Sequence, residues 1–100
     1  MQEKGFHETA ISHYKKAIQI NRRYSIAYKN LGICLHELSK YDEAAANYRK
    51  ALDIDPGLRD ALAGLGQVLM MLGEHREGLD LLREANGSIF FHLEDGISFS

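Results

Sequence analysis

The chain has 100 residues, of which 45% are hydrophobic and 26% are charged, as in an ordinary globular domain. The formal net charge of -2 gives no basic surface for nucleic acid, and no apolar run reaches the roughly 20 residues of a membrane-spanning helix. The single cysteine, Cys34, excludes a disulfide within the chain and suits a reducing compartment. Since the N-terminus has no signal-peptide pattern, we expect a cytoplasmic protein.

Five segments carry apolar residues at steps of three and four, which is the period of an α-helix. We expect helices over about residues 6–21, 25–38, 42–55, 59–72 and 76–86. Ser25 and Asp42 are the expected N-caps, Asp55-Pro56-Gly57 ends the third helix, and Asn86-Gly87 ends the fifth. Because short turns place consecutive helices side by side in antiparallel pairs, the expected fold class is all-α.

An internal repeat relates these helices to one another. Three similar segments begin at Gly5, Ser39 and Gly73, a spacing of 34 residues. Equivalent positions hold similar residues: small at Ala10, Ala44 and Gly78, large at Tyr14, Tyr48 and Leu82, and alanine at Ala17, Ala51 and Ala85. A second pair of segments, 28–32 and 62–66, interleaves with the first at the same spacing. Glycine inside a helix lowers its stability, which indicates that helices pack closely at these positions.

The pattern resembles the tetratricopeptide repeat. Within residues 25–58 the resemblance is carried by Tyr28, Leu31-Gly32, Leu35, Ala44, Tyr48, Ala51 and Pro56. The next unit departs from the pattern, with Gly78 at the alanine position and Phe90 at the proline position. The first unit supplies only a second helix. The resemblance implies helix-turn-helix repeats stacked as a right-handed superhelical solenoid.

The register divides the chain in two. Residues 1–87 are the expected repeat array: the second helix of one repeat, a complete repeat at 25–58 and a degenerate repeat at 59–87. Residues 88–100 form a strand-like tail in which 89–93 and 97–99 are joined by Glu94-Asp95-Gly96, the pattern of a short β-hairpin. Such a hairpin would cap the array, pair with another copy or begin a following domain, and the alternative is a disordered tail.

The first helix of the array has no partner on its outer side. Its apolar residues Ile11, Ile18 and Ile20 would therefore be partly unsupported. We expect either that the chain was cut from a longer array or that it self-associates through an open end. Sedimentation distinguishes both from a stable monomer.

The resemblance implies a protein-protein interaction scaffold, in which the first helix of each pair lines a concave groove. The groove candidates are Lys29, Asn30, Ile33, His36, Glu37, Asp60, Ala63, Gln67, Met70 and Met71, with Ile26 and Gly64 on the same two stripes. In this interpretation Asn30 and Gln67 bond the backbone of a bound peptide or helix, and Met70 and Met71 form an apolar floor. The alternative is that the charged members are merely solvated and the methionines belong to the core.

Some members of the family bind a C-terminal carboxylate through basic and asparagine side chains. Lys29 and Asn30 fit two positions of that clamp, and Lys29 would take the carboxylate. The next helix offers no Arg or Lys at the corresponding places. The stripes carry charges of both signs, so no strongly charged ligand is indicated.

Catalysis and metal binding have little support in the sequence. His7 and His75 fall on different units, and Cys34 and His36 are two apart on a helix, so their side chains diverge. We therefore expect no enzyme activity, no metal and no cofactor. Two other functions stay open: a non-catalytic repeat region of a larger enzyme, for example a transferase, and a self-assembling structural module. The partner is expected to be a protein or peptide, without nucleic acid or membrane.

Overall fold

The computed structural model describes residues 2–86, with side chains from Gly5 onward. This part of the chain consists of five helices and contains no strand: α1 Gln2–Ile20, α2 Ser25–Glu37, α3 Tyr41–Ile54, α4 Arg59–Met71 and α5 His75–Ala85. The all-α prediction is confirmed, and each helix end lies within a few residues of its expected place. The predicted β-hairpin, and Gly87 of the predicted stop, lie outside the described residues.

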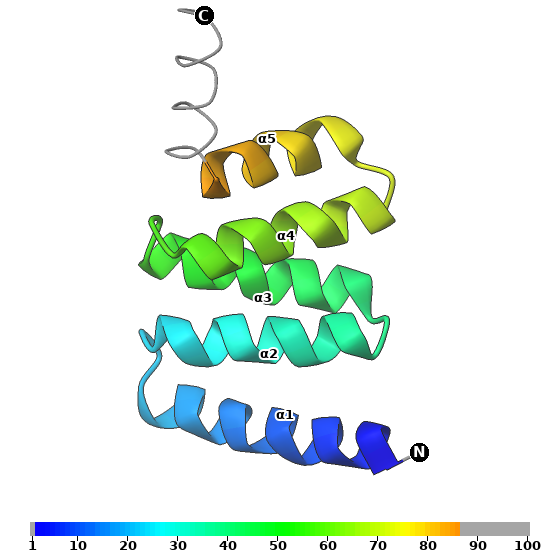
Figure 1. Ribbon diagram of the computed structural model, residues 1–100. Helices are drawn as coiled ribbons and strands as arrows, with labels where there is room; N and C mark the ends of the chain where they lie inside the picture. Colours follow the sequence, from blue (N-terminus) through cyan, green and yellow to red (C-terminus); the bar gives the residue numbers. More distant parts are fainter. Residues whose placement is uncertain (1, 87–100) are drawn as a thin grey trace, which may run out of the picture.

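The helices stack one after another along the molecule, each roughly antiparallel to the one before (Figure 1). Each helix contacts its neighbours in sequence, and α2 also contacts α4 directly. The chain therefore forms two stacked helix pairs, α2–α3 and α4–α5, with α1 packed on the outer side of α2. This is the solenoid architecture that the 34-residue period predicts.

The predicted N-caps are wrong. Tyr24 and Lys40 occupy the N-cap positions of α2 and α3, neither makes a side-chain cap, and Ser25 and Asp42 lie inside the first turn. The backbone explains the shift, because the carbonyl of Lys40 already accepts the N–H of Ala44 and so closes the first helical turn. Asp42 instead places its carboxylate at the positive end of the helix dipole.

The turns that end α2 and α4 repeat the same geometry 34 residues apart. Ser39 has φ of 64° and Gly73 has φ of 89°, both in the left-handed region. The N–H of Lys40 donates to the carbonyl of Leu35, and the N–H of Glu74 donates to that of Leu69. These bonds across a left-handed residue are those of a Schellman motif, so both first helices end in the same way.

The core is centred on Tyr48 of α3, which is 1% exposed. Its ring lies against Gly32 of α2 and Gly64 of α4, where an added Cβ would come within 3.0 Å and 2.5 Å of ring carbons. Alanines and leucines of the three helices complete the cluster, including Ala44, Ala51, Ala61, Leu31, Leu35 and Leu65. The small residues of the repeat therefore make room for one large side chain that joins two repeats.

A second close approach joins α4 to α5. A Cβ on Gly66 would stand 2.9 Å from the carbonyl oxygen of Gly78, and one on Gly78 would stand 2.8 Å from that of Gly66. The prediction of close packing at these glycines is confirmed. Across the stack, the guanidinium of Arg49 in α3 donates to the carboxylate of Glu77 in α5 at 3.0 Å.

The outer side of α1 is largely exposed. Ile11, Tyr14 and Ile18 pack against the core and are half-buried, whereas Phe6 is 73% exposed and Ile20 is 87% exposed. The expectation of an unsupported apolar surface holds most clearly for Ile20. No helix within residues 2–86 is long and apolar enough to cross a membrane.

Candidate functional site

The two predicted groove helices, α2 and α4, lie beside each other although 21 residues of turn and helix separate them in sequence. They are the first helices of successive pairs, so their equivalent residues face the same side of the solenoid. The amine of Lys29 in α2 lies 3.6 Å from the carboxylate of Asp60 in α4, which links the two stripes directly. The structure thus joins one candidate of each stripe, Lys29 and Asp60, across the two helices.

The ten candidates differ in exposure. Five are exposed, namely Ile33, Glu37, Asp60, Gln67 and Met71, and five are half-buried, namely Lys29, Asn30, His36, Ala63 and Met70. Ile26 is also exposed, at 36%. Gly64 does not belong to the surface: it is buried under the ring of Tyr48, so its placement on the groove stripe is wrong.

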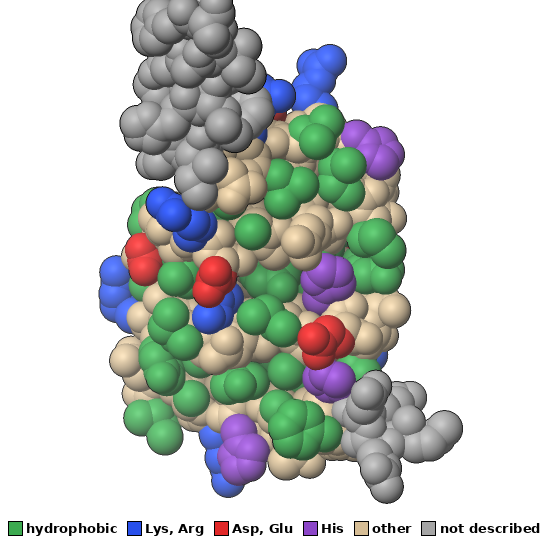
Figure 2. Space-filling model, in the orientation of Figure 1, with side chains coloured by type: hydrophobic (Ala, Val, Ile, Leu, Met, Phe, Trp, Pro, Cys, Tyr) green, Lys and Arg blue, Asp and Glu red, His purple; other side chains and the backbone are tan. Residues whose placement is uncertain are grey.

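The methionines take different roles. The Cγ and Sδ atoms of Met70 lie 3.1 Å from where a Cβ on Gly78 would stand, so Met70 packs toward α5 and is half-buried. Met71 is 59% exposed. Ile26, Ile33 and Met71 expose apolar side chains, and a bound partner can bury them and exclude water from them. On the face in Figure 2, hydrophobic side chains occur over all five helices, with charged groups and histidines between them.

The family comparison agrees with this geometry. Residues 25–58 match the family model described as tetratricopeptide repeat. Residues 25–58 are therefore a tetratricopeptide repeat. The repeat signature of Tyr28, Leu31-Gly32, Ala44, Tyr48 and Ala51 is the set of residues that the structure packs around the α2–α3 hairpin.

Several known proteins are similar to these tetratricopeptide repeats. The chain is 37% identical over 59 residues to heat shock protein STI1 of Saccharomyces cerevisiae, which covers 59% of the chain and 10% of that protein. It is 29% identical over 73 residues to the UDP-N-acetylglucosamine–peptide N-acetylglucosaminyltransferase of Giardia intestinalis, which covers 72% of the chain and 5% of the transferase. The chain therefore spans a tenth or less of the length of either relative.

A solved structure shows the same tetratricopeptide fold. The second tetratricopeptide domain of Spaghetti (RPAP3), bound to the HSP90 peptide SRMEEVD, superposes with a TM-score of 0.78 at 22% identity. The match covers 84% of this chain and 82% of that chain. It shows that residues outside the matched repeat at 25–58 also follow the solenoid arrangement.

One contact at the end of the first groove helix was not foreseen from the sequence. The Nε2 atom of His7 in α1 is hydrogen-bonded to the carboxylate of Glu37 in α2, and the Nδ1 atom of His7 is buried with no partner. On the other side of α2, the ring of His36 meets that of Tyr41 edge-on at 5.8 Å. His7 and Tyr41 occupy the same position of the tetratricopeptide repeat, and that equivalence was the signal available in the sequence.

Two buried groups of this repeat are held in their neutral forms. Burial, and then the negative charge of Glu37, raises the pKa of the Cys34 thiol. Burial, followed by the charges of Glu37 and Cys34, raises the pKa of Tyr48 to about 12. Both shifts work against a thiolate or phenolate nucleophile. Among residues 2–86 no group of three or more His, Cys, Asp and Glu side chains is placed to hold a metal ion.

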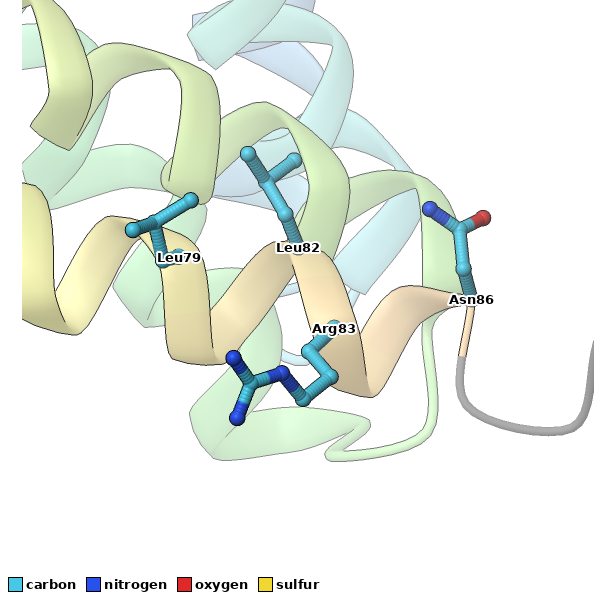
Figure 3. A pocket seen from close by; sticks show the side chains of 4 residues that line it. All are labelled: Leu79, Leu82, Arg83 and Asn86. Atoms are coloured by element: carbon cyan, nitrogen blue, oxygen red, sulfur yellow. The ribbon is translucent and has the colours of Figure 1, made fainter. Parts of the chain in front are cut away.

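A shallow depression of about 260 Å³ lies on α5, and one of its lining residues, Leu82, also packs against Gly66 of α4. Leu79, Leu82, Arg83 and Asn86 line it, at the point where the described chain ends (Figure 3). Leu79 is 49% exposed. In a tetratricopeptide array this is the side on which a following repeat would pack, and the sequence pattern did not single it out.

Proposed function

We propose that the chain is a protein-protein interaction scaffold that binds a peptide or helix of a partner protein along α2 and α4. The observation that supports the proposal is the contact between α2 and α4, where Lys29 of one repeat is paired with Asp60 of the next. Asn30 and Gln67 would bond the partner's backbone, and Ile33 and Met71 would contact its apolar side chains.

The comparisons support this class of function. A similar tetratricopeptide domain is described in complex with a peptide of HSP90, and STI1 is a heat shock protein. In this chain Ile33 and Gln67 replace a second basic or asparagine group, and Lys29 is already paired with Asp60. We therefore propose a ligand other than an acidic chaperone tail. We further propose that the protein acts in the cytoplasm.

The proposed organisation follows the repeat. Residues 1–87 act as one array, and residues 88–100 act as a cap or as the start of a following domain. The array itself is proposed to have no catalytic role, no metal and no cofactor.

Self-association through the exposed outer side of α1 is an additional proposal. Sedimentation of the purified chain at several concentrations tests it.

A selection from a random peptide display library tests the groove. The wild-type chain should enrich peptides, and the variant K29A/N30A/Q67A should lose most of that enrichment. The matched control is Q19A/N47A/K50A, which removes the same three side-chain types from α1 and α3. If the groove variant retains all the peptides that the control retains, the binding site lies elsewhere.

The similarity to the Giardia transferase favours a second candidate, a non-catalytic repeat region carried on a larger enzyme. That similarity covers 72% of the chain, which is more than the STI1 match covers. The sequence of the full-length gene decides between the two. A catalytic domain on the same polypeptide would favour the enzyme, and its absence would favour the free-standing scaffold.

A further inference from the structure

The charged side chains of the groove are not equally available. The side chain of Lys29 is 15% exposed, whereas that of Asp60 is 75% exposed and that of Glu37 is 56% exposed. The lysine is covered and its amine is directed at Asp60, so a bound carboxylate would have to displace Asp60 to reach it. Both acidic groups can still accept hydrogen bonds from a new donor, because a carboxylate has about four acceptor sites. The sequence shows mixed charge, but the accessible charge is negative.

Lys29 and Glu37 lie along α2, and Asp60 of α4 reaches the amine of Lys29. Lys29, Ile33 and Glu37 are four residues apart, so they share one face of the helix. Eight residues of helix rise about 12 Å, so this is the backbone spacing of Lys29 and Glu37 along α2, and the Asp60 carboxylate lies 3.6 Å from the amine of Lys29. Ile33, which is 36% exposed, lies midway between Lys29 and Glu37 in α2.

We infer that the groove takes an extended peptide segment with a basic residue, an apolar residue two positions later and a second basic residue two positions after that. Extended chain rises about 3.3 Å per residue, so positions i and i+4 are about 13 Å apart and point to the same side. The two basic side chains would meet Asp60 and Glu37, and the apolar one would meet Ile33. The inference rests on the proposed function, since it names the ligand class of the same surface.

The contacts at each end favour this occupant over an acidic one. The carboxylate of Glu37 already accepts a hydrogen bond from the imidazole of His7, and its side chain remains more than half exposed. Asp60 stands in the first turn of α4. An acidic peptide would face both carboxylates and gain only the covered amine of Lys29. Arg59, the neighbour of Asp60 in α4, lies outside both stripes.

The same peptide display selection tests the inference when its output is read by sequence. Peptides enriched by the wild-type chain should show an excess of the basic-x-apolar-x-basic pattern over the input library. The variant E37Q/D60N should lose that excess and still enrich apolar peptides. The control D53N/E84Q, which removes two exposed carboxylates from α3 and α5, should keep it.

Affinity measurements complete the test. For enriched basic peptides with blocked ends, E37Q/D60N should bind about three- to tenfold more weakly than wild type, as expected for two exposed ion pairs. Rising salt should weaken wild-type binding, which gives a second measurement if the variant does not fold. Enrichment of neutral or acidic peptides would overturn the inference and leave the scaffold function standing. If the wild-type chain enriches no more peptides than K29A/N30A/Q67A does, both the inference and the scaffold function are overturned.

Discussion

The close approach of α4 and α5 makes Gly66→Ala a sharp test of the packing. A Cβ at Gly66 would stand 2.7 Å from Leu82 Cγ and 2.9 Å from the backbone oxygen of Gly78. The carbonyl cannot move without shifting α5, so we expect an overpacking loss of about 1–3 kcal/mol. Against this, replacing glycine in a helix gains about 1 kcal/mol of helix propensity.

Gly5→Ala is the matched control, because Gly5 also lies inside a helix and a Cβ there would meet nothing within 4 Å. It should gain up to about 1 kcal/mol from propensity alone. The two variants should therefore differ in unfolding free energy by about 1–3 kcal/mol, the overpacking term alone. In thermal unfolding followed by circular dichroism, about 4–8 °C separates variants for each kcal/mol. Equal shifts for the two variants would refute the packing argument.

Three further outcomes follow from the backbone and the buried groups. Ser39→Gly should raise the melting temperature, because Ser39 has φ of 64° and the left-handed region costs a non-glycine residue about 1–2 kcal/mol; an unchanged or lower melting temperature would contradict the strain. Tyr48, with its pKa raised from 10.0 to about 12, stabilises the fold below pH 10 and loses that contribution as the pH rises through 12. Alkaline unfolding of Tyr48→Phe should therefore be shallower over this range, and an identical profile would show that the phenol is not held neutral. Cys34, buried and with a raised pKa, should react with a thiol reagent slowly in the native chain and rapidly in urea, whereas fast native labelling would place it at the surface.

The sequence predicted the helices well because two independent patterns agreed. Apolar residues at helical steps located each element, and the 34-residue period fixed their order and pairing. Single-residue detail at the helix starts could not be predicted. Ser25 and Asp42 are typical N-cap residues, but the turn geometry places them one or two residues inside the helix.

For the candidate site, the sequence could predict which helices lie side by side but not the interactions between their side chains. The period correctly placed α2 beside α4, but it could not show that Lys29 is paired with Asp60. It also could not separate Asn30 from Gly64, which are equivalent in the repeat. Asn30 is half-buried, whereas Gly64 is covered by Tyr48 because that ring reaches across from α3. Pairings between repeats depend on side-chain length and direction, which a one-dimensional pattern does not contain.

The end of α2 illustrates how one repeat position makes different contacts in two successive units. Tyr41 of α3 meets His36 from one side, and its equivalent in the preceding unit, His7 of α1, meets Glu37 from the other. The same position therefore supplies a contact to each side of the helix end that carries two groove candidates. Because His7 bonds the carboxylate directly, α1 contacts the Glu37 end of α2. Helix α1 thus reaches a residue of the candidate groove and also covers the core through Ile11, Tyr14 and Ile18.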